Sequence, residues 1–473
     1  MIFKKHLFNI LLATLFCILP LYSWGQKKII IFADPHVMSP SLLINDGTAW
    51  QNYLDKQRKM VDKSAELFSQ MIKIIKTEKP DLVLIPGDMT KDGEEVSHEY
   101  VIAGLKELLQ QGIPAYVIPG NHDINNPDAV SYNGNTTTKA ATVTENQFAS
   151  LYADYGYSET VRDPNSLSYC CEPIPGLVLI GIDSYSGSIS DVTVNWICQQ
   201  ARSAAGKQVI AIMHHGLIPH FYDEDKFSEL TALVNNHNTI VKKFADAGIK
   251  VVFTGHFHIS DISKETINGN EIYDVSTGSP ISYPCDYRII TWKNNQLSII
   301  TKSISSCDQD PDFSLSYAEN RLHTQLINFA QRIVASSFDE MTANLINNLN
   351  PNPYEALANA FIINAQGNEE LNSESSSALD NLTGFFNITE LMKRPTKGMI
   401  TSMLENESPD TLHCSIVNDR TLTITLPTVS GITTLYDDKA GIKNNFYYTI
   451  EGLKVTRPIK RGVYIHNGEK IIY

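Results

Sequence analysis

Residues 27–37 of the chain read Lys-Lys-Ile-Ile-Ile-Phe-Ala-Asp-Pro-His-Val, an apolar run followed at once by two ionisable side chains. The run Lys28–Phe32 is short, β-branched and continuous, which is typical of a strand buried on both faces. In an extended chain, residues i and i+2 point to the same side. Asp34 and His36 can therefore present a carboxylate and an imidazole to one point just past the predicted strand.

Similar apolar runs follow along the chain, and helical patterns separate them. After the first strand, apolar residues recur on one helical stripe that comprises Val61, Ala65, Phe68, Ile72 and Ile75. Further helices are predicted over residues 94–110, 190–204 and 237–247. This alternation of strands and helices indicates an α/β domain. The other predicted strands are Asp81–Pro86, Ala115–Pro119, Leu177–Ile182, Gln208–Met213 and Lys250–Thr254.

Side chains that can bind metal follow five of these strands, at the edge of an α/β sheet where ligands bind. Gly87, Gly120 and Gly255 stand beside them, and glycine lets the backbone turn sharply and approach an ion closely. Carboxylate, amide and imidazole groups together suit Mn, Fe, Zn or Co better than Ca. Seven candidates exceed the needs of one tetrahedral zinc, and they fit two ions roughly 3.5–4 Å apart that share a carboxylate. The candidates are Asp34, His36, Asp88, Asn121, His214, His256 and His258.

These motifs resemble, in order, those of the calcineurin-like metallophosphoesterase family over residues 27–300. The resemblance implies an α/β fold with a two-layer β-sandwich core flanked by helices. It assigns one divalent ion to Asp34, His36, Asp88 and His258, and the other to Asp88, Asn121, His214 and His256. The motifs that carry the resemblance are Asp34-x-His36, Gly87-Asp88, Gly120-Asn121-His122-Asp123, His214 and Gly255-His256-x-His258.

The same resemblance implies a mechanism for the hydrolysis of a phosphate ester. The ion pair lowers the pKa of a shared water, and the resulting hydroxide attacks phosphorus in line with the leaving oxygen. His122 is expected to assist the leaving group as a catalytic residue. Asp123 is expected to orient the His122 imidazole through a hydrogen bond.

Other polar residues near the motifs receive plainer interpretations. Asp92-Gly93 is interpreted as a turn, and His215 is expected to pack behind His214. Asp183 follows another strand, and the sequence leaves open whether it supports the site. Lys91 stands where the purple acid phosphatase branch has a tyrosine, so an iron–tyrosinate centre is not expected. This part of the chain is more similar to the branch that contains cyclic-nucleotide and other small phosphodiesterases.

Two catalytic motifs of other hydrolases are missing from the sequence. It contains no GxxxxGK[ST] loop, which excludes a P-loop nucleotide hydrolase. It also contains no GxSxG elbow, which argues against a serine hydrolase of that type.

The first residues of the chain predict the cellular compartment of the mature protein. Lys4 and Lys5 precede an apolar run over residues 7–21 that is short for a membrane span, and Ser23 and Gly25 are small residues suited to signal-peptidase cleavage. We interpret residues 1–25 as a signal peptide, with a retained anchor as the alternative. The mature protein is expected to be secreted to the periplasm or the cell surface.

The net charge and the cysteine content of the chain limit the binding partners and the disulfide bonds that can be expected. The formal charge is −14, and removal of two lysines with the signal peptide gives −16. So acidic a surface repels polyanions, and no nucleic-acid partner is expected. Six cysteines remain in the mature chain, an even number that permits disulfides in an oxidising compartment but leaves their pairing open. They are Cys170, Cys171, Cys198, Cys285, Cys307 and Cys414.

The sequence predicts three units after the signal peptide. Residues 26–305 form the α/β domain, residues 306–408 show helical periodicity, and residues 409–473 show β alternation. Within the last unit, Asn467-Gly468 is a typical type I′ turn. The segments 448–455 and 460–471 are similar to C-terminal sorting or anchoring modules of proteins secreted by Bacteroidetes. A plain accessory sheet is the alternative.

The predicted function is a secreted dinuclear-metal phosphoesterase, with phosphodiesters slightly preferred over monoesters. One alternative is a phospholipid head-group or sphingomyelinase-like hydrolase, for which an exposed apolar stripe on residues 315–405 and association with a membrane or cell surface would be expected. Another is a catalytically silent metal-containing binding protein, although such a protein has no use for a general acid at His122. The oligomeric state is left open.

Overall fold

The computed structural model describes residues 25–204, 206–221, 224, 232–367, 373–394, 396–404, 419–427, 447–449, 454–455, 463–466 and 469–472. Residues 1–24 of the predicted signal peptide, Cys414 and the Asn467-Gly468 turn lie outside these ranges. Among the described residues no helix has the length and apolar character to cross a membrane. The five cysteines in these ranges, Cys170, Cys171, Cys198, Cys285 and Cys307, are free.

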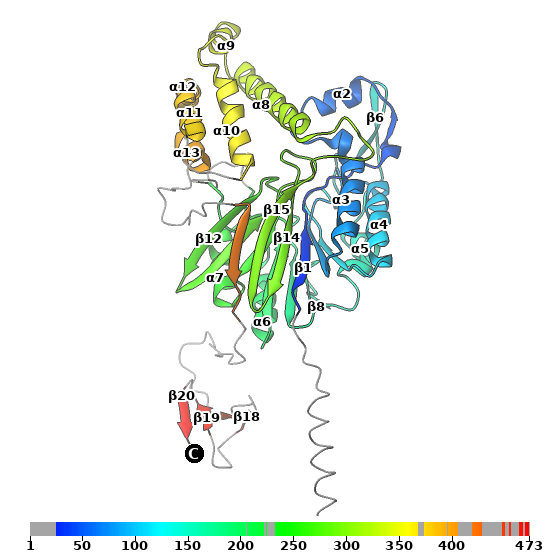
Figure 1. The fold of residues 1–473 in the computed structure, drawn as a ribbon, viewed down its shortest axis with the longest axis vertical. Helices are drawn as coiled ribbons and strands as arrows, with labels where there is room; N and C mark the ends of the chain where they lie inside the picture. The colour runs from blue at the N-terminus through cyan, green and yellow to red at the C-terminus, as the bar shows by residue number, and fades with distance from the viewer. Residues whose placement is uncertain are drawn as a thin grey trace, which may run out of the picture.

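Two mixed β-sheets pack against each other at the centre of the protein (Figure 1). Neighbouring strands β1, β3 and β4 run parallel in the first sheet, as do β9, β10 and β11 in the second. The first sheet has the order β16 (Thr421–Thr425), β15 (Gln296–Ser303), β14 (Asp286–Lys293), β1 (Lys27–Ile31), β3 (Leu82–Pro86) and β4 (Ala115–Ile118). The second has the order β12 (Asp261–Ile267), β13 (Asn270–Ser276), β11 (Val251–Thr254), β10 (Gln208–Met213), β9 (Leu177–Ile182), β8 (Tyr169–Ile174) and β7 (Val161–Arg162).

The side chains of β9 and β10 explain why these strands read as continuous apolar runs. Leu177 and Leu179 enter the core that is shared with the first sheet, whereas Val178 and Ile180 enter a second core on the opposite face. Every residue of β9 and β10 is buried. A strand covered on both faces has no polar side to expose, so the alternation typical of half-exposed strands is lost.

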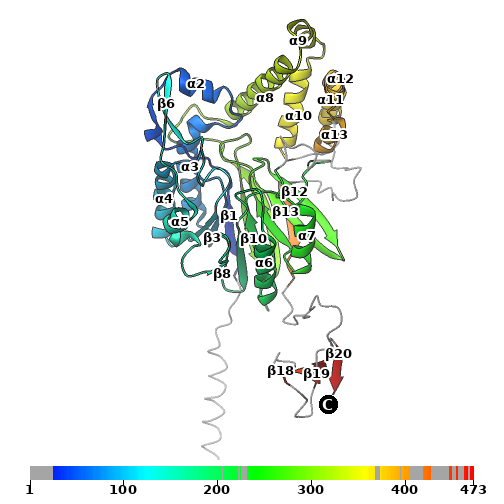
Figure 2. The same ribbon diagram turned by 180° about the vertical axis from the view of Figure 1, so that it is seen from behind.

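Helices cover the outer faces of both sheets (Figure 2). Helices α3 (Ser64–Glu78) and α4 (Glu95–Gln110) pack on the first sheet, and α5 (Glu145–Leu151) lies beside α4. Helices α6 (Asp191–Ser203) and α7 (His237–Asp246) contribute to the outer core of the second sheet. The predicted stripe from Val61 to Ile75 is buried. The predicted fold class, a two-layer β core flanked by helices, is confirmed.

A small three-stranded sheet stands next to α2 (Thr48–Leu54). Its strands are β2 (Leu43–Asn45), β5 (Val130–Asn133) and β6 (Thr136–Lys139). The rings of Trp50, Tyr53 and Tyr132 contact one another there, with centroids 4.8–5.6 Å apart. This aromatic cluster fixes α2 to the sheet.

A helical appendage follows strand β15 of the first sheet along the chain and lies at the end of the sandwich where β1 ends (Figures 1 and 2). It has its own apolar core, which includes Tyr354, Leu382 and Leu404. An ion pair of 2.7 Å between Arg321 and Asp62 ties the appendage to the α/β domain. Its helices within the described residues are α8 (Leu315–Ser337), α9 (Glu340–Asn347), α10 (Pro353–Ala365), α11 (Ser373–Asn381), α12 (Thr383–Leu391) and α13 (Lys397–Leu404).

The C-terminal strands differ from the sequence prediction at one point. Strand β16, which we assigned to the C-terminal module, pairs with β15 and extends the first sheet. Ile424 faces Leu297 across this pair and is buried, so one apolar face of β16 completes the edge of the domain core. Strands β17 (Tyr447–Thr449), β18 (Lys454–Val455), β19 (Val463–His466) and β20 (Glu469–Ile472) form a separate four-stranded sheet. The similarity of this segment to sorting modules stays a prediction.

Candidate metal centre

All seven predicted ligands lie in loops that directly follow strands. Strands β1, β3 and β4 run parallel in one sheet, and β10 and β11 run parallel in the other. Both sets end at the same rim of the sandwich, where His214 Nδ1 after β10 lies 2.9 Å from the Pro86 carbonyl at the end of β3. The loops after these strands bring the seven side chains into one cluster with two overlapping groups.

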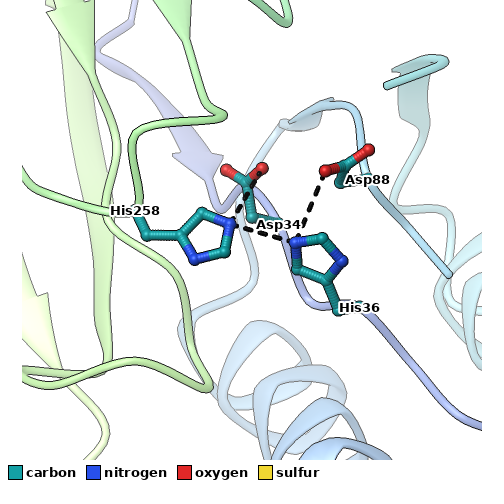
Figure 3. Close-up of side chains that lie close together, drawn as sticks. All are labelled: Asp34, His36, Asp88 and His258. Carbon is teal, nitrogen blue, oxygen red and sulfur yellow. Dashed lines mark hydrogen bonds and ion pairs between the residues drawn. The ribbon is translucent and has the colours of Figure 1, made fainter. Parts of the chain in front are cut away.

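The first group consists of Asp34, His36, Asp88 and His258 (Figure 3). The Nε2 atoms of His36 and His258 face each other at 3.0 Å. His36 Nε2 lies 3.4 Å from Asp88 Oδ2, and His258 Nε2 lies 3.6 Å from Asp34 Oδ1. Four ligand atoms from three strand ends therefore converge on one small volume.

The second group shares Asp88 with the first. His214 Nε2 lies 3.5 Å from Asp88 Oδ2, 3.1 Å from His256 Nδ1 and 2.9 Å from Asn121 Oδ1. The carbonyl oxygen of Pro86 accepts a hydrogen bond of 2.9 Å from His214 Nδ1–H, which leaves Nε2 with a lone pair for a metal ion. Asp88 is the carboxylate placed to bridge two ions.

The backbone is strained at the ligands themselves. Asp34, His36, Asp88, His256 and His258 all have positive φ angles, between 38° and 66°. Residues with side chains rarely adopt this region, and such outliers cluster at functional sites where the surrounding structure holds them. Five of the seven predicted ligands share this strain, which indicates that ligand placement takes precedence over local backbone stability.

The buried donor set fits divalent cations. Burial lowers the pKa of His36 and His258 well below the ordinary value, and the Lys59 ammonium lowers both further. Both rings are therefore neutral, and each keeps one unprotonated nitrogen that can bind a metal ion. Metal ions require neutral imidazoles and ionised carboxylates, so His36 and His258, whose Nε2 atoms face each other at 3.0 Å, are in the protonation state in which they could hold a cation together with Asp34 and Asp88.

His122 lies beside the first group, but its ring contacts residues outside both ligand groups. Its ring centroid is 4.7 Å from that of His36, in an edge-on arrangement. Its Nδ1 lies 2.7 Å from the Lys91 carbonyl and 2.9 Å from Asp92 Oδ1. Its backbone N–H donates to Asp88 Oδ1 at 2.8 Å. The ring is partly exposed, and Nε2 is the nitrogen left for proton transfer.

The expected role of Asp123 is wrong. Its carboxylate is buried and accepts hydrogen bonds from the backbone N–H groups of Gly120, Met89 and Thr90, at 2.9–3.2 Å. Successive side chains diverge, so Asp123 points away from the ring of His122 and joins the loops after β3 and β4. Asp92, which the sequence suggested was only a turn residue, is the carboxylate that contacts the imidazole.

Comparison with known proteins agrees with this geometry. Residues 27–260 match the family model described as Calcineurin-like phosphoesterase. The chain carries a calcineurin-like phosphoesterase domain. The match includes all seven predicted ligands together with His122 and Asp92.

Individual relatives of the phosphoesterase domain are distant. A protein of Arcobacter nitrofigilis named "Probable glycerophosphodiester phosphodiesterase" is 28% identical over 142 residues, which cover 29% of this chain and 42% of that protein. A dimetal phosphatase structure from Danio rerio aligns with 13% identity and a TM-score of 0.45, over 59% of this chain and 96% of that one. A purple acid phosphatase from yellow lupin aligns with 12% identity and a TM-score of 0.36, over 61% and 53% of the two chains.

Sequence reasoning missed several residues of the phosphoesterase site. Lys59 Nζ lies 3.0 Å from His36 Nδ1, and burial lowers the pKa of this lysine to about 8. Ser282 Oγ is 3.3 Å from His258 Nδ1 and leaves Nε2 of that ring directed at the cluster. Both residues come from loops without a periodic pattern, so only the folded chain reveals them.

Two residues that the sequence left aside are now placed. The ring of His215 packs against those of His256 and His214, with centroids 4.3 Å and 5.0 Å apart, as expected for a residue behind the ligands. Asp183 accepts the backbone N–H groups of Leu167 and Tyr185 and belongs to neither ligand group.

Gly255 tests how closely the backbone must approach the ligands. A Cβ atom at this position would lie 2.5 Å from Asp34 Oδ2 and 3.0 Å from the Pro86 carbonyl oxygen. We expect Gly255→Ala to displace the Asp34 carboxylate and weaken metal binding by roughly 10–100-fold, measured as bound metal at set free-ion concentrations. The control is Gly384→Ala in α12, where the nearest atom is 3.9 Å away. Equal metal affinity in both variants would contradict this tight approach.

Proposed function

We propose that the protein is a secreted hydrolase of phosphate esters that uses two divalent ions and prefers phosphodiesters. The single observation that carries this proposal is the pair of buried ligand groups that share Asp88 at the rim of the phosphoesterase domain. Asp34, His36 and His258 would hold one ion with Asp88. Asn121, His214 and His256 would hold the other with the same carboxylate.

Bound divalent ions supply Lewis acidity toward phosphoryl oxygens and lower the pKa of a coordinated water. The residues of the chain supply orientation and proton transfer. His122, held through Nδ1 by Asp92 and the Lys91 carbonyl, can deliver a proton from Nε2 to the leaving oxygen. Burial alone would raise the pKa of Asp92, but the hydrogen bond from His122 and the charge of Lys91 lower it, so Asp92 is ionised and accepts the hydrogen bond from His122 Nδ1.

Two further parts of the proposal have separate support. The preference for diesters rests on the glycerophosphodiester phosphodiesterase named among the relatives and on the extension of the cavity beyond the metal ligands. Secretion rests on the charge and hydropathy pattern of residues 1–25. The ion identities, among Mn, Fe and Zn, follow from the mixed oxygen and nitrogen ligands.

The test is hydrolysis of bis-p-nitrophenyl phosphate and p-nitrophenyl phosphate by the mature chain. The protein is stripped with a chelator and then restored with Mn, Fe or Zn. We expect release of nitrophenolate only after metal is restored, with higher kcat/KM on the diester. Turnover that persists without metal would refute the metal mechanism, and a higher kcat/KM on the monoester would refute the substrate preference. Two bound ions with no turnover of either ester would favour the silent binding protein.

A further inference from the structure

A cavity of about 470 Å³ begins at the metal ligands and extends to the helical appendage. At one end it is lined by residues of the two ligand groups and by His122. This volume is within the range of pockets that hold small organic ligands, and it exceeds the space that a phosphate group needs. The cavity therefore has room for a part of the substrate other than the phosphate.

The part of the cavity wall that the appendage forms is apolar. Helices α8, α10 and α13 contribute seven described residues to the cavity, and all seven have apolar side chains. Among them, Leu322, Phe329 and Phe361 are only half-buried, so part of each ring or chain still borders open space. This wall offers no charged or hydrogen-bonding side chain to a sugar or a second phosphate, whereas an alkyl or aryl group would bury against it.

Phe257 joins this wall to the metal centre. It stands between the ligands His256 and His258 in sequence and packs with the apolar core of the appendage. Its ring stacks on His220 with centroids 5.5 Å apart, and it lies 5.9 Å from the ring of Phe221. A group esterified to a phosphate at the ligands would therefore meet apolar surface immediately.

The charge distribution orients such a molecule. Lys56, Arg58 and Lys59 line the same cavity, although the chain as a whole carries −14. The Arg58 guanidinium lies 5.6 Å from the centroid of the Phe329 ring, where the basic segment meets the appendage. An anionic phosphate is attracted to the side of the ligands and lysines, and an apolar substituent to the side of the helices.

We propose that this cavity binds the apolar alcohol of an amphiphilic phosphate ester, and that the appendage is its specificity element. The proposal rests on the proposed phosphoesterase function and defines the class of substrate. The occupant is the apolar part of that alcohol, which is an alkyl chain, an acyl chain or an aromatic ring.

The test is a series of alkyl p-nitrophenyl phosphates from methyl to octyl, used as monomers with the metal-loaded mature protein. Each buried methylene is expected to raise kcat/KM by about fourfold until the cavity is full, so octyl should exceed methyl by more than about 100-fold. Phenyl p-nitrophenyl phosphate tests whether an aromatic ring occupies the cavity. Comparison of kcat/KM for dihexanoylphosphatidylcholine and glycerophosphocholine tests whether the acyl chains of a lipid occupy the cavity.

Variants locate the effect in the appendage. Phe361→Gln should lower the octyl-to-methyl ratio at least tenfold, and Leu322→Gln on a different helix provides a second variant if the first does not fold. Leu391→Gln is the matched control, because Leu391 is 67% exposed on α12 and does not line the cavity. A ratio near one in the unmodified protein, or an unchanged ratio in both lining variants, would overturn the proposal.

Calorimetric binding of octyl phosphate and methyl phosphate separates this inference from the proposed function. Tighter binding of octyl phosphate that is lost in Phe361→Gln supports the apolar site even if no ester is hydrolysed. Hydrolysis of all esters at similar kcat/KM, with equal binding of both phosphates, would support the phosphoesterase function and refute the apolar site.

Discussion

Replacing Asp88 by asparagine is expected to lower kcat/KM at least about 1000-fold and to reduce bound metal below two ions per chain. Asp88 is the residue that the two ligand groups have in common. An amide has one weak oxygen ligand where a carboxylate has two charged ones, so it cannot bridge two cations. The fold should persist, because the amide oxygen of the new side chain can still accept the His122 backbone N–H that now donates to Asp88 at 2.8 Å. Metal analysis and steady-state kinetics on the nitrophenyl esters measure both effects.

The matched control is Asp183→Asn. Asp183 also follows a buried strand, but its oxygens accept backbone N–H groups away from the ligand cluster. This variant should retain two ions and most of the activity. If Asp88→Asn kept two ions and more than about a tenth of the activity, a bridging role for Asp88 would be excluded.

The sequence predicted the strands well because burial on both faces leaves a clear pattern. The predicted bounds Leu177–Ile182 and Gln208–Met213 coincide with β9 and β10. The ligand positions were predictable for a related reason, since polar residues that interrupt buried apolar runs mark the strand ends. Strand β16 was harder, because an alternating pattern such as that around Ile424 fits the edge of any sheet.

Contacts between loops could not be predicted from local patterns. Asp123 directly follows His122 and Asp92 precedes it by 30 residues, yet the directions of their side chains bring Asp92, not Asp123, to the ring. Lys59 reaches His36 from a segment with no regular period. The appendage was predicted as helical, but its apolar wall on the cavity depends on how the helices pack over the domain.

Replacing His122 by glutamine is expected to lower kcat by about 10²–10⁴-fold on esters with poor leaving groups. Alkyl alcohols leave with difficulty and need a proton, whereas p-nitrophenolate is stable as an anion. The loss should therefore be much smaller for p-nitrophenyl esters than for dialkyl phosphates. Bound metal should remain at two ions per chain, because His122 belongs to neither ligand group. The kcat of the variant is measured on both classes of ester, and the metal content of the same protein preparation is measured in parallel.

Asp92 and Asp123 provide the paired controls for this prediction. Asp92→Asn should reproduce part of the loss and its dependence on the leaving group, because Asp92 Oδ1 lies 2.9 Å from His122 Nδ1. Asp123→Asn should instead lower Tm, because its buried carboxylate accepts three backbone N–H groups and the Thr90 hydroxyl. An equal loss on good and poor leaving groups, or a loss of metal that parallels the loss of kcat, would show that His122 supports the site without donating a proton.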